Sequence, residues 1–404
     1  MRILFLTPIG AIGGAERVLL DMIASLRRAE SGPEVHVIAG GDGPLLPALD
    51  RAGATVTPLP IPRSLARVGD SALIGTGRTP SRLLSAFGAT QAIAGVSGYA
   101  LRLRRTVNRL RPDIIHSNGN KFHLLSRLAL GHRWPVIWHL HDFLGERPLI
   151  RRLARRAAPG VDCAIAVSEA VARDARSILG RTPIEVIANG VDVERFSPGP
   201  GDGSLLDRLA GLPPASNAVR IGLVATYARW KGQDLFLEAA ARVPAEIPVR
   251  VFIIGGPIYQ TAGSQFTAEE LRRRIAELGL ADRVGLIPFQ NSMPDIYRAL
   301  DLAVHASRRP EPFGLTIAEA MACGRPVIVS LAGGASELVR HDQDAFGVEP
   351  NNADQLAAAI ATLAADPGRR ERIAQSARRT ALERFDRNRL GPSLLAVYRR
   401  LARG

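Results

Sequence analysis

Short apolar runs alternate with longer amphipathic segments along the first half of the chain, a pattern typical of parallel βαβ units. Arg2–Thr7 predicts a strand, Ala15–Arg28 a helix with one apolar face, and Glu34–Ala39 a second strand. Later segments predict three more strands and a helix, namely Asp113–His116, Val136–His141, Cys163–Val167 and the helix that begins at about Glu169. The first half therefore predicts a Rossmann-like α/β domain.

The same alternation restarts after a segment rich in proline and glycine, residues 198–218, which predicts a linker. Beyond it the pattern predicts strands and helices in turn: Arg220–Val224, Gln233–Ala241, Arg250–Ile254, Thr267–Leu278, Leu302–His305, Leu315–Ala322 and Pro326–Ser330. From Asp354 onward the chain is almost wholly helical. We therefore expect two Rossmann-like domains, residues 1–197 and 219–387, with a C-terminal helix at about 388–404 that packs back on the first.

Composition agrees with a folded, two-domain chain. Hydrophobic residues make up 46% of the 404 residues and charged residues 22%, which allows a sizeable core and argues against disorder. Cys163 and Cys323 are too few for a disulfide framework and lack metal-ligand neighbours, so we expect both to be buried as small apolar residues. This cysteine usage favours a cytoplasmic location.

The positive charge is concentrated in the first half of the chain. The formal net charge is +14, and residues 1–200 hold 26 basic and 16 acidic side chains. Arginines cluster at residues 102–111 and 147–156, with apolar residues interleaved, as in a basic amphipathic helix. Such a face suits an anionic membrane or a lipid-diphosphate acceptor, and it is equally compatible with a solvated surface. Nucleic-acid binding is disfavoured, because no aromatic residue is interleaved for base stacking.

Two glycine-containing turns are candidates for binding an anion. Gly13-Gly14 follows the first strand and opens a helix, which suits close approach of backbone N–H groups to a phosphate, although a tight turn without ligand explains it too. The spacing does not match the G-x-G-x-x-G dinucleotide motif. Arg229 and Lys231 precede Gly232 at a second strand-to-helix turn, and two cations there suit a diphosphate or a solvated basic turn.

A pair of histidines ends one of the predicted strands. His139 and His141 share a face of that strand, because strand side chains alternate. No third ligand is evident, so a metal site is disfavoured. His141 at the carboxyl end of a parallel strand is a candidate hydrogen-bond donor to a substrate, with a half-buried structural histidine as the alternative.

The most specific pattern is Glu311-Pro-Phe-Gly-Leu-Thr-Ile-Ala-Glu319. Pro312 and Gly314 predict a turn, and the helix that starts at Leu315 offers free N–H groups to an anion. A carboxylate accepts two hydroxyl hydrogen bonds, which suits recognition of a sugar or a ribose. Asp342-Gln-Asp344 is similar to the D-x-D of metal-dependent sugar transferases, but it lies in a polar segment and predicts a turn.

Together these residues resemble the retaining glycosyltransferases of family 4, over nearly the whole chain and in order. The matching segments are Gly13-Gly14-Ala-Glu16, Asp113-Ile-Ile-His116, His141-Asp142, Val167-Ser-Glu169, Asn189-Gly-Val-Asp192, Lys231-Gly232, Glu311 with Glu319, and Gly333-Gly-Ala-Ser-Glu337. The resemblance implies a GT-B fold, in which two Rossmann-like domains with parallel sheets face each other across a central cleft. It also implies metal-independent transfer of a sugar, with retention, from a nucleoside-diphosphate sugar to a hydroxyl acceptor in bacterial envelope glycolipid or polysaccharide synthesis.

The resemblance also implies roles for particular residues. The catalytic set comprises His141, Glu311 and Lys231, and the donor-binding set comprises Gly13, Gly14, Phe313, Gly314, Leu315, Thr316 and Glu319. One departure matters, because many members carry Gly-Arg-Leu where this chain has Ala225-Thr-Tyr227. Our hypothesis is that Arg229 replaces the missing arginine and joins the catalytic set.

The resemblance also leads to expectations about cofactors, substrates and location. No cofactor is expected, and no metal is required if Lys231, Arg229 and the helix start stabilise the diphosphate. The substrate is a UDP-, GDP- or ADP-sugar, and the acceptor is a hydroxyl, with a lipid-linked molecule as one option. We expect a cytoplasmic protein, with peripheral attachment to the inner face of the membrane as the further possibility, and no nucleic-acid partner. The alternative function is a GT-B nucleotide-sugar epimerase or hydrolase, which would need no separate acceptor.

Overall fold

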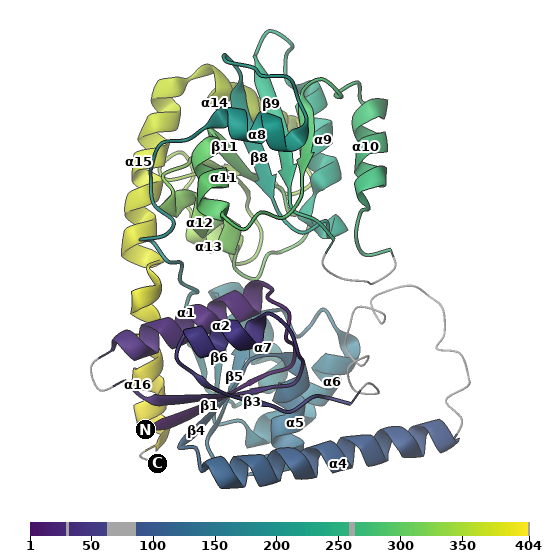
Figure 1. Ribbon diagram of the computed structural model, residues 1–404, viewed down its shortest axis with the longest axis vertical. Coiled ribbons are helices and arrows are strands. Elements are labelled where there is room, and N and C mark those ends of the chain that lie inside the picture. Colours follow the sequence, from purple (N-terminus) through teal and green to yellow (C-terminus); the bar gives the residue numbers. More distant parts are fainter. Residues whose placement is uncertain (30–31, 63–85, 258–262, 403–404) are drawn as a thin grey trace. The chain divides into compact units, whose positions relative to one another are not determined.

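The described residues of the computed structural model are 1–29, 32–62, 86–257 and 263–402, and they fall into two units (Figure 1). Unit 1 comprises Met1–Asn189 together with Arg387–Gly404, and unit 2 comprises Gly190–Asp386. Each unit has its own parallel sheet covered by helices, so the expected α/β class is confirmed.

Unit 1 contains a seven-stranded sheet with the order β3-β2-β1-β4-β5-β6-β7, and all of its strand pairs are parallel. Its strands are β1 (Arg2–Thr7), β2 (Glu34–Ala39), β3 (Thr55–Pro58), β4 (Ile114–Ser117), β5 (Val136–Leu140), β6 (Cys163–Ala166) and β7 (Ile184–Val186). The central strands are buried and mainly apolar, as expected for a parallel sheet with helices on both faces, although they also hold the buried polar residues Thr7, His116, Ser117 and His139. The strand order reverses at β1 and β4, and their carboxyl ends therefore border the place where such sheets bind ligands.

The helices of unit 1 are α1 (Gly14–Arg28), α2 (Leu45–Arg51), α4 (Ala86–Leu110), α5 (Asn120–Leu130), α6 (Pro148–Ala157), α7 (Glu169–Leu179) and α16 (Leu390–Ala402). By their contacts they form two groups, one of α1, α2 and α16 and one of α4 to α7. In Figure 1, α16 lies beside α1, and the α1–α16 contact includes a 2.7 Å hydrogen bond from Gly391 N–H to Ser25 Oγ. Along the chain, α4 contacts α5, α5 contacts α6 and α6 contacts α7.

Unit 2 contains a six-stranded parallel sheet with the order β10-β9-β8-β11-β12-β13. Its strands are β8 (Val219–Val224), β9 (Val249–Ile254), β10 (Val284–Ile287), β11 (Leu302–His305), β12 (Val327–Ser330) and β13 (Phe346–Val348). Its helices are α8 (Gly203–Ala210), α9 (Gln233–Arg242), α10 (Ala268–Glu277), α11 (Met293–Ala299), α12 (Leu315–Ala322), α13 (Ala335–Leu338), α14 (Ala353–Ala365) and α15 (Pro367–Arg384). The sheet order reverses at β8 and β11, so the turns that follow these two strands are neighbours.

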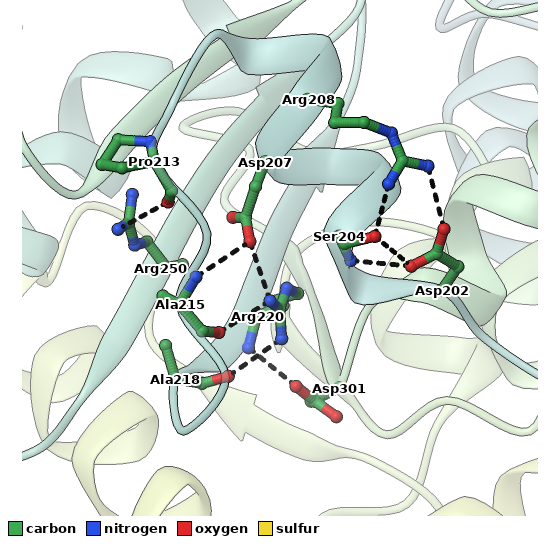
Figure 2. Close-up of polar contacts among 10 residues, drawn as sticks. All are labelled: Asp202, Ser204, Asp207, Arg208, Pro213, Ala215, Ala218, Arg220, Arg250 and Asp301. Carbon is green, nitrogen blue, oxygen red and sulfur yellow. Dashed lines mark hydrogen bonds and ion pairs between the residues drawn. The ribbon is translucent and has the colours of Figure 1, made fainter.

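The segment that we expected to be a linker, residues 198–218, instead contains α8 and belongs to unit 2. Asp202 caps this helix through the N–H of Ser204, and a buried ion pair ties the helix to β8 (Figure 2). In that pair Arg220 Nη2 lies 2.8 Å from Asp207 Oδ2. The boundaries between the units accordingly fall at Asn189/Gly190 and Asp386/Arg387. The first lies eight residues before the predicted boundary after residue 197, and the second lies one residue before the predicted boundary after residue 387.

Most of the predicted strands and helices match observed ones to within a residue or two at their ends. The pattern missed β3, β7, β10 and β13, which are the edge strands of the two sheets and are three or four residues long. Cys163 and Cys323 are buried free thiols, as expected, and burial raises their pKa values to about 11 and about 12. None of the helices in the described ranges combines the length and apolar character needed to cross a bilayer.

Candidate functional site

Two loops at the carboxyl edge of the unit 2 sheet bring Lys231 and Glu311 together. Lys231 ends the short 3-10 turn Arg229–Lys231 after β8, and Glu311 follows β11. Lys231 Nζ donates a 2.6 Å hydrogen bond to Glu311 Oε2, with side-chain exposures of 20% and 9%. The amine also lies 4.1 Å from the centre of the Trp230 ring. The sequence therefore brings one cation and one carboxylate into a mostly buried pair.

Within the described ranges, the side chains that donate to the Glu311 carboxylate all reach the same oxygen. In addition to Lys231, His305 Nε2 lies 3.1 Å and Ser307 Oγ 3.0 Å from Oε2. Among the described residues, Oε1 has no hydrogen-bond partner, and it is not one of the buried unpaired atoms. Burial alone would raise the pKa of Glu311, but Lys231 and His305 outweigh it and hold the pKa well below its ordinary value. Glu311 is thus a fixed carboxylate with one oxygen open to a ligand.

The two loops approach so closely because of a glycine and an arginine. Gly232 has a φ of +77°, and a Cβ there would overlap the carbonyl oxygen of Ala306. Arg308 N–H donates to the Trp230 carbonyl at 2.7 Å. The Arg308 guanidinium also binds both carboxylate oxygens of Asp234, at 3.0 and 2.8 Å. These contacts fix the Lys231 turn against the segment that leads to Glu311.

The Gly333-Gly334 pair of the sequence motif supports the backbone of Glu311. Glu311 N–H donates to the Ala332 carbonyl at 3.2 Å, and Gly334 N–H donates to the Glu311 carbonyl at 2.6 Å. Gly333 has a φ of +66°, and a Cβ at this position would lie 2.6 Å from the Glu311 carbonyl oxygen. Gly333 therefore allows a second chain segment to pass directly beside Glu311.

The start of α12 lies next to Glu311 in the chain. Gly314 is the N-cap residue, and Phe313 before it is buried, with its ring 6.1 Å from that of Phe385. The N–H groups of Leu315 and Thr316 belong to the first helical turn, where no intrahelical acceptor exists. These donors and the helix dipole favour an anion at this end.

Glu319 lies within α12 and is almost completely buried. Tyr297, on α11, donates its hydroxyl hydrogen to Glu319 Oε2 at 2.8 Å. A carboxylate oriented in this way has the acceptor chemistry that we assigned to hydroxyl recognition. Tyr297 was not predicted, since a tyrosine in an amphipathic helix has no sequence motif of its own.

Arg229 does not join the Lys231 cluster in this structure. Its Nη2 donates a 2.6 Å hydrogen bond to Glu270 Oε1, on α10, and its guanidinium carbon lies 4.2 Å from the centre of the Phe266 ring. Our hypothesis that Arg229 serves a diphosphate therefore requires it to leave this ion pair. Its role remains a prediction.

Unit 1 places the glycine turn at the carboxyl end of β1. Gly13 precedes α1 and donates its N–H to Glu16 Oε2 at 3.1 Å, while Gly14 begins the helix. Burial raises the pKa of Glu16. The side chain of Glu16 thus stabilises the turn that presents Gly13 and Gly14 at the edge of the sheet.

The histidine pair ends β5 in unit 1, and the two rings stack as their shared face predicts. The His139 and His141 ring centres are 4.4 Å apart with an interplanar angle of 19°. His139 is buried, and its Nδ1 lies 3.0 Å from His116 Nε2. His141 is less buried and its Nε2 lies 2.7 Å from Asn118 Oδ1. His139 is therefore a structural residue, and His141 is the candidate that faces a ligand.

Burial lowers the pKa of His141 to about 4, so the ring is neutral at pH 7. Within the described part of the chain no cluster of three or more His, Cys, Asp or Glu side chains is arranged to hold a metal ion. Asp342-Gln-Asp344 forms a turn, as predicted, and Asp342 binds Arg369 while Asp344 accepts from Thr380.

Comparison with known proteins identifies both halves of the chain. The family model described as Glycosyltransferase Family 4 matches residues 12–195, and the model described as Glycosyl transferases group 1 matches residues 212–380. Together they span most of unit 1 and of unit 2, including every candidate residue named above.

Two curated relatives show how far the sequence similarity extends. The D-inositol 3-phosphate glycosyltransferase of Rhodococcus jostii (strain RHA1) is 35% identical over 54% of this chain and 47% of its own length. The lipopolysaccharide core biosynthesis mannosyltransferase LpsB of Rhizobium meliloti (strain 1021) is 36% identical over 55% of this chain and 62% of its own length. The chain thus matches about half the length of its curated relatives.

Solved structures match the whole chain. Anabaena Alr3699/HepE in complex with UDP-glucose covers 99% of this chain and 100% of that chain, with 28% identity and a TM-score of 0.80. The complex of the same protein with UDP is 29% identical over the same shares, with a TM-score of 0.79. The fold is therefore GT-B.

Proposed function

Because the chain belongs to glycosyltransferase family 4, we propose that it transfers a sugar, with retention, from a nucleoside-diphosphate sugar to a hydroxyl acceptor. The observation that carries this proposal is the Glu311 carboxylate, with three donors on Oε2 and with Oε1 open. Lys231 contacts this carboxylate, and α12 begins four residues after it in the chain. A lysine and the free N–H groups of a helix start are suited to bind the negative charge of a diphosphate.

The chemistry follows from the charges that develop during transfer. The bond from the anomeric carbon to the diphosphate oxygen breaks, a bond to the acceptor oxygen forms on the same face, and the acceptor proton passes to the leaving phosphate. Lys231 and the N–H groups of Leu315 and Thr316 stabilise the negative charge that grows on the diphosphate. Glu311 Oε1 accepts a hydroxyl hydrogen bond from the sugar, and Glu319 accepts from the ribose. No protein nucleophile takes part in this scheme.

The donor nucleotide, the means of neutralising the diphosphate and the type of reaction are each supported by a different observation. We propose a UDP-sugar as donor, supported by the likeness over the whole chain to a protein solved with UDP and UDP-glucose. We propose that Lys231 and the α12 start neutralise the diphosphate without a bound cation. The relatives bear the names of transferases, which favours transfer over epimerisation or hydrolysis.

A transfer assay tests the proposal directly. The protein is incubated with UDP-glucose, UDP-galactose, GDP-mannose or ADP-glucose, with and without detergent-solubilised bacterial lipids as acceptors, and both nucleotide and free sugar are measured. We expect nucleotide release that depends on acceptor, with one preferred base and an α-linked product. Equal amounts of free sugar and nucleotide without acceptor would indicate a hydrolase, and no nucleotide release from any donor would refute the proposal.

We also propose that the acceptor is carried on an anionic membrane, supported by α6. Its exposed residues include Arg151, Arg152, Arg155 and Arg156, and Leu149 is 43% exposed, while Ile150 and Ala154 are buried. Each basic residue near an anionic surface contributes about 1 kcal/mol of attraction. The outward face of α6 therefore combines charge with one apolar side chain.

Vesicle flotation tests the membrane claim. We expect flotation with phosphatidylglycerol vesicles and not with phosphatidylcholine vesicles, and we expect replacement of Arg152 and Arg156 by Gln to weaken it. Replacement of Arg372 and Arg379, two exposed arginines of α15, is the matched control. Equal flotation of both double variants, or none at low salt, would contradict the claim.

A further inference from the structure

Asn118 links the two parts of unit 1 that carry candidate residues. It follows β4 directly, and its Oδ1 lies 2.7 Å from Nε2 of His141. Its Nδ2 donates a longer, 3.4 Å hydrogen bond to the carbonyl oxygen of Ala15, in the first turn of α1. Asn118 is buried, and nothing in the sequence patterns singled it out. One amide thus contacts both the glycine turn region and the histidine.

These two contacts fix which atom of the Asn118 amide points in which direction. The Ala15 carbonyl oxygen has no proton to donate, so only the NH₂ group of Asn118 can bind it. The amide oxygen must then face His141, and an amide oxygen only accepts. Nε2 of His141 consequently carries the ring proton, and in a neutral ring the other nitrogen, Nδ1, does not.

The remaining contacts hold the ring of His141 in place without using Nδ1. His139 stacks against it, and His139 is itself held through His116, whose Nδ1 lies 2.7 Å from the Tyr398 hydroxyl. Nδ1 of His141 has no hydrogen-bond partner in the described part of the chain and is not one of the buried unpaired atoms. It is an accessible acceptor on a fixed ring.

We propose that Asn118 is a positioning residue that holds His141 in the Nε2–H form, so that Nδ1 accepts a hydrogen bond from a substrate hydroxyl. The proposal rests on the proposed function, since the hydroxyl belongs to the donor sugar. It also reverses our sequence-based expectation that His141 donates to the substrate. An unprotonated Nδ1 repels a phosphate oxygen, so His141 selects for the sugar and contributes nothing to diphosphate binding.

The first test measures the ring proton and needs no substrate. The full-length protein is labelled with nitrogen-15 histidine, and long-range proton–nitrogen spectra at pH 7 report which ring nitrogens carry protons. The His141 signals are those missing from His141→Gln. We expect the Nε2–H form in the wild type and partial conversion to Nδ1–H in Asn118→Ala, with no change in Asn108→Ala. An Nδ1–H or doubly protonated ring in the wild type, or an unchanged ring in Asn118→Ala, would overturn the proposal.

The second test separates positioning from a merely structural role. Binding of UDP and of UDP-glucose is measured by calorimetry for the wild type, Asn118→Ala and Asn108→Ala. We expect Asn118→Ala to weaken UDP-glucose binding by about 2- to 10-fold, the value of one neutral hydrogen bond, and to leave UDP binding unchanged. Equal weakening of both ligands would indicate a general structural effect and contradict the proposal. Failure of the wild type to bind UDP would refute the proposed UDP-sugar donor instead, while the spectra still decide the role of Asn118.

Discussion

Replacement of Lys231 by Met removes the positive charge from the Lys231–Glu311 ion pair of the candidate site and keeps most of the side-chain volume. The variant leaves Glu311 in place with two of its three donors, His305 and Ser307. Because Lys231 is 20% and Glu311 9% exposed, the remaining carboxylate gains little compensation from water. Glu311 therefore loses its strongest partner while it stays buried.

The magnitude follows from these contacts. Removal of one partner from a buried ion pair typically costs about 3–5 kcal/mol, and the two remaining donors place this case near the lower value. For a unit of the size of Gly190–Asp386, about 3 kcal/mol corresponds to a fall in Tm of about 6–12 °C. We expect this fall at pH 7 for the transition of unit 2.

The pH dependence has a definite sign. The pKa of folded Glu311 lies below its ordinary value of 4.5, so the wild type gains stability from this carboxylate above about pH 4.5 and loses it as the pH falls through the folded pKa. In Lys231→Met the lysine charge that lowers the pKa of Glu311 is absent, so burial raises the pKa of Glu311 in the folded protein. The difference in Tm between the two proteins should therefore be largest at pH 7 and shrink below pH 4.5.

Scanning calorimetry between pH 3.5 and pH 7.5 measures this difference. Lys121→Met, which removes the only other lysine and lies on α5 in unit 1, is the matched control and should show a smaller, pH-independent change. The double variant Lys231→Met/Glu311→Gln should lose less stability than the sum of the single variants. A Tm difference that stays constant over this pH range, or a Lys231→Met protein as stable as the wild type, would refute the reasoning.

Three further predictions concern other contacts. Arg220→Met should destabilise unit 2 by about 5 kcal/mol, because the buried Asp207 then retains a single N–H donor at 3.4 Å (Figure 2). Asp207→Leu should cost only about 3 kcal/mol, because Arg220 then retains carbonyl acceptors at 2.8 and 3.4 Å. Equal losses of stability in urea denaturation would contradict this difference. Tyr297→Phe should weaken UDP binding by about 2- to 10-fold in calorimetry, since Glu319 loses an orienting hydrogen bond, and unchanged affinity would exclude that role. Gly232→Ala should abolish transfer while unit 1 stays folded by hydrogen exchange, because the new Cβ collides with a backbone carbonyl, and an active variant would contradict the close approach.

The sequence predicted the two strands that precede Lys231 and Glu311, but it did not predict that these two side chains form an ion pair. Both residues follow strands of a parallel sheet, and such strands end at one edge. Ser307 and Asn118 were missed, although each is a polar residue within two positions of the end of an apolar strand. A polar residue just after the end of an apolar strand can therefore be predicted as a site residue. Its specific role cannot be predicted, because the partner residue that determines the role is distant in sequence or has no local pattern.

The segment 198–218 shows the opposite error. Its proline and glycine content favoured a linker, yet Asp202 and Gly211 are typical N-terminal and C-terminal capping residues for the helix that lies between them. The pairing of Asp207 with Arg220 then attaches this helix to the sheet. One buried ion pair does not change the hydrophobic periodicity of the sequence. The prediction therefore followed the proline and glycine content of the segment rather than its capping residues.

We propose that unit 2 binds a nucleoside diphosphate through Lys231 and the start of α12 without a metal ion. The most direct measurement is a thermal-shift titration of the wild type, Lys231→Met and Lys121→Met with UDP, GDP and ADP, each with and without EDTA. We predict that one nucleotide raises the Tm of the wild type and of Lys121→Met equally with and without EDTA, and that Lys231→Met loses this shift. A shift that disappears in EDTA, a full shift in Lys231→Met, or no shift with any of the three nucleotides would contradict it.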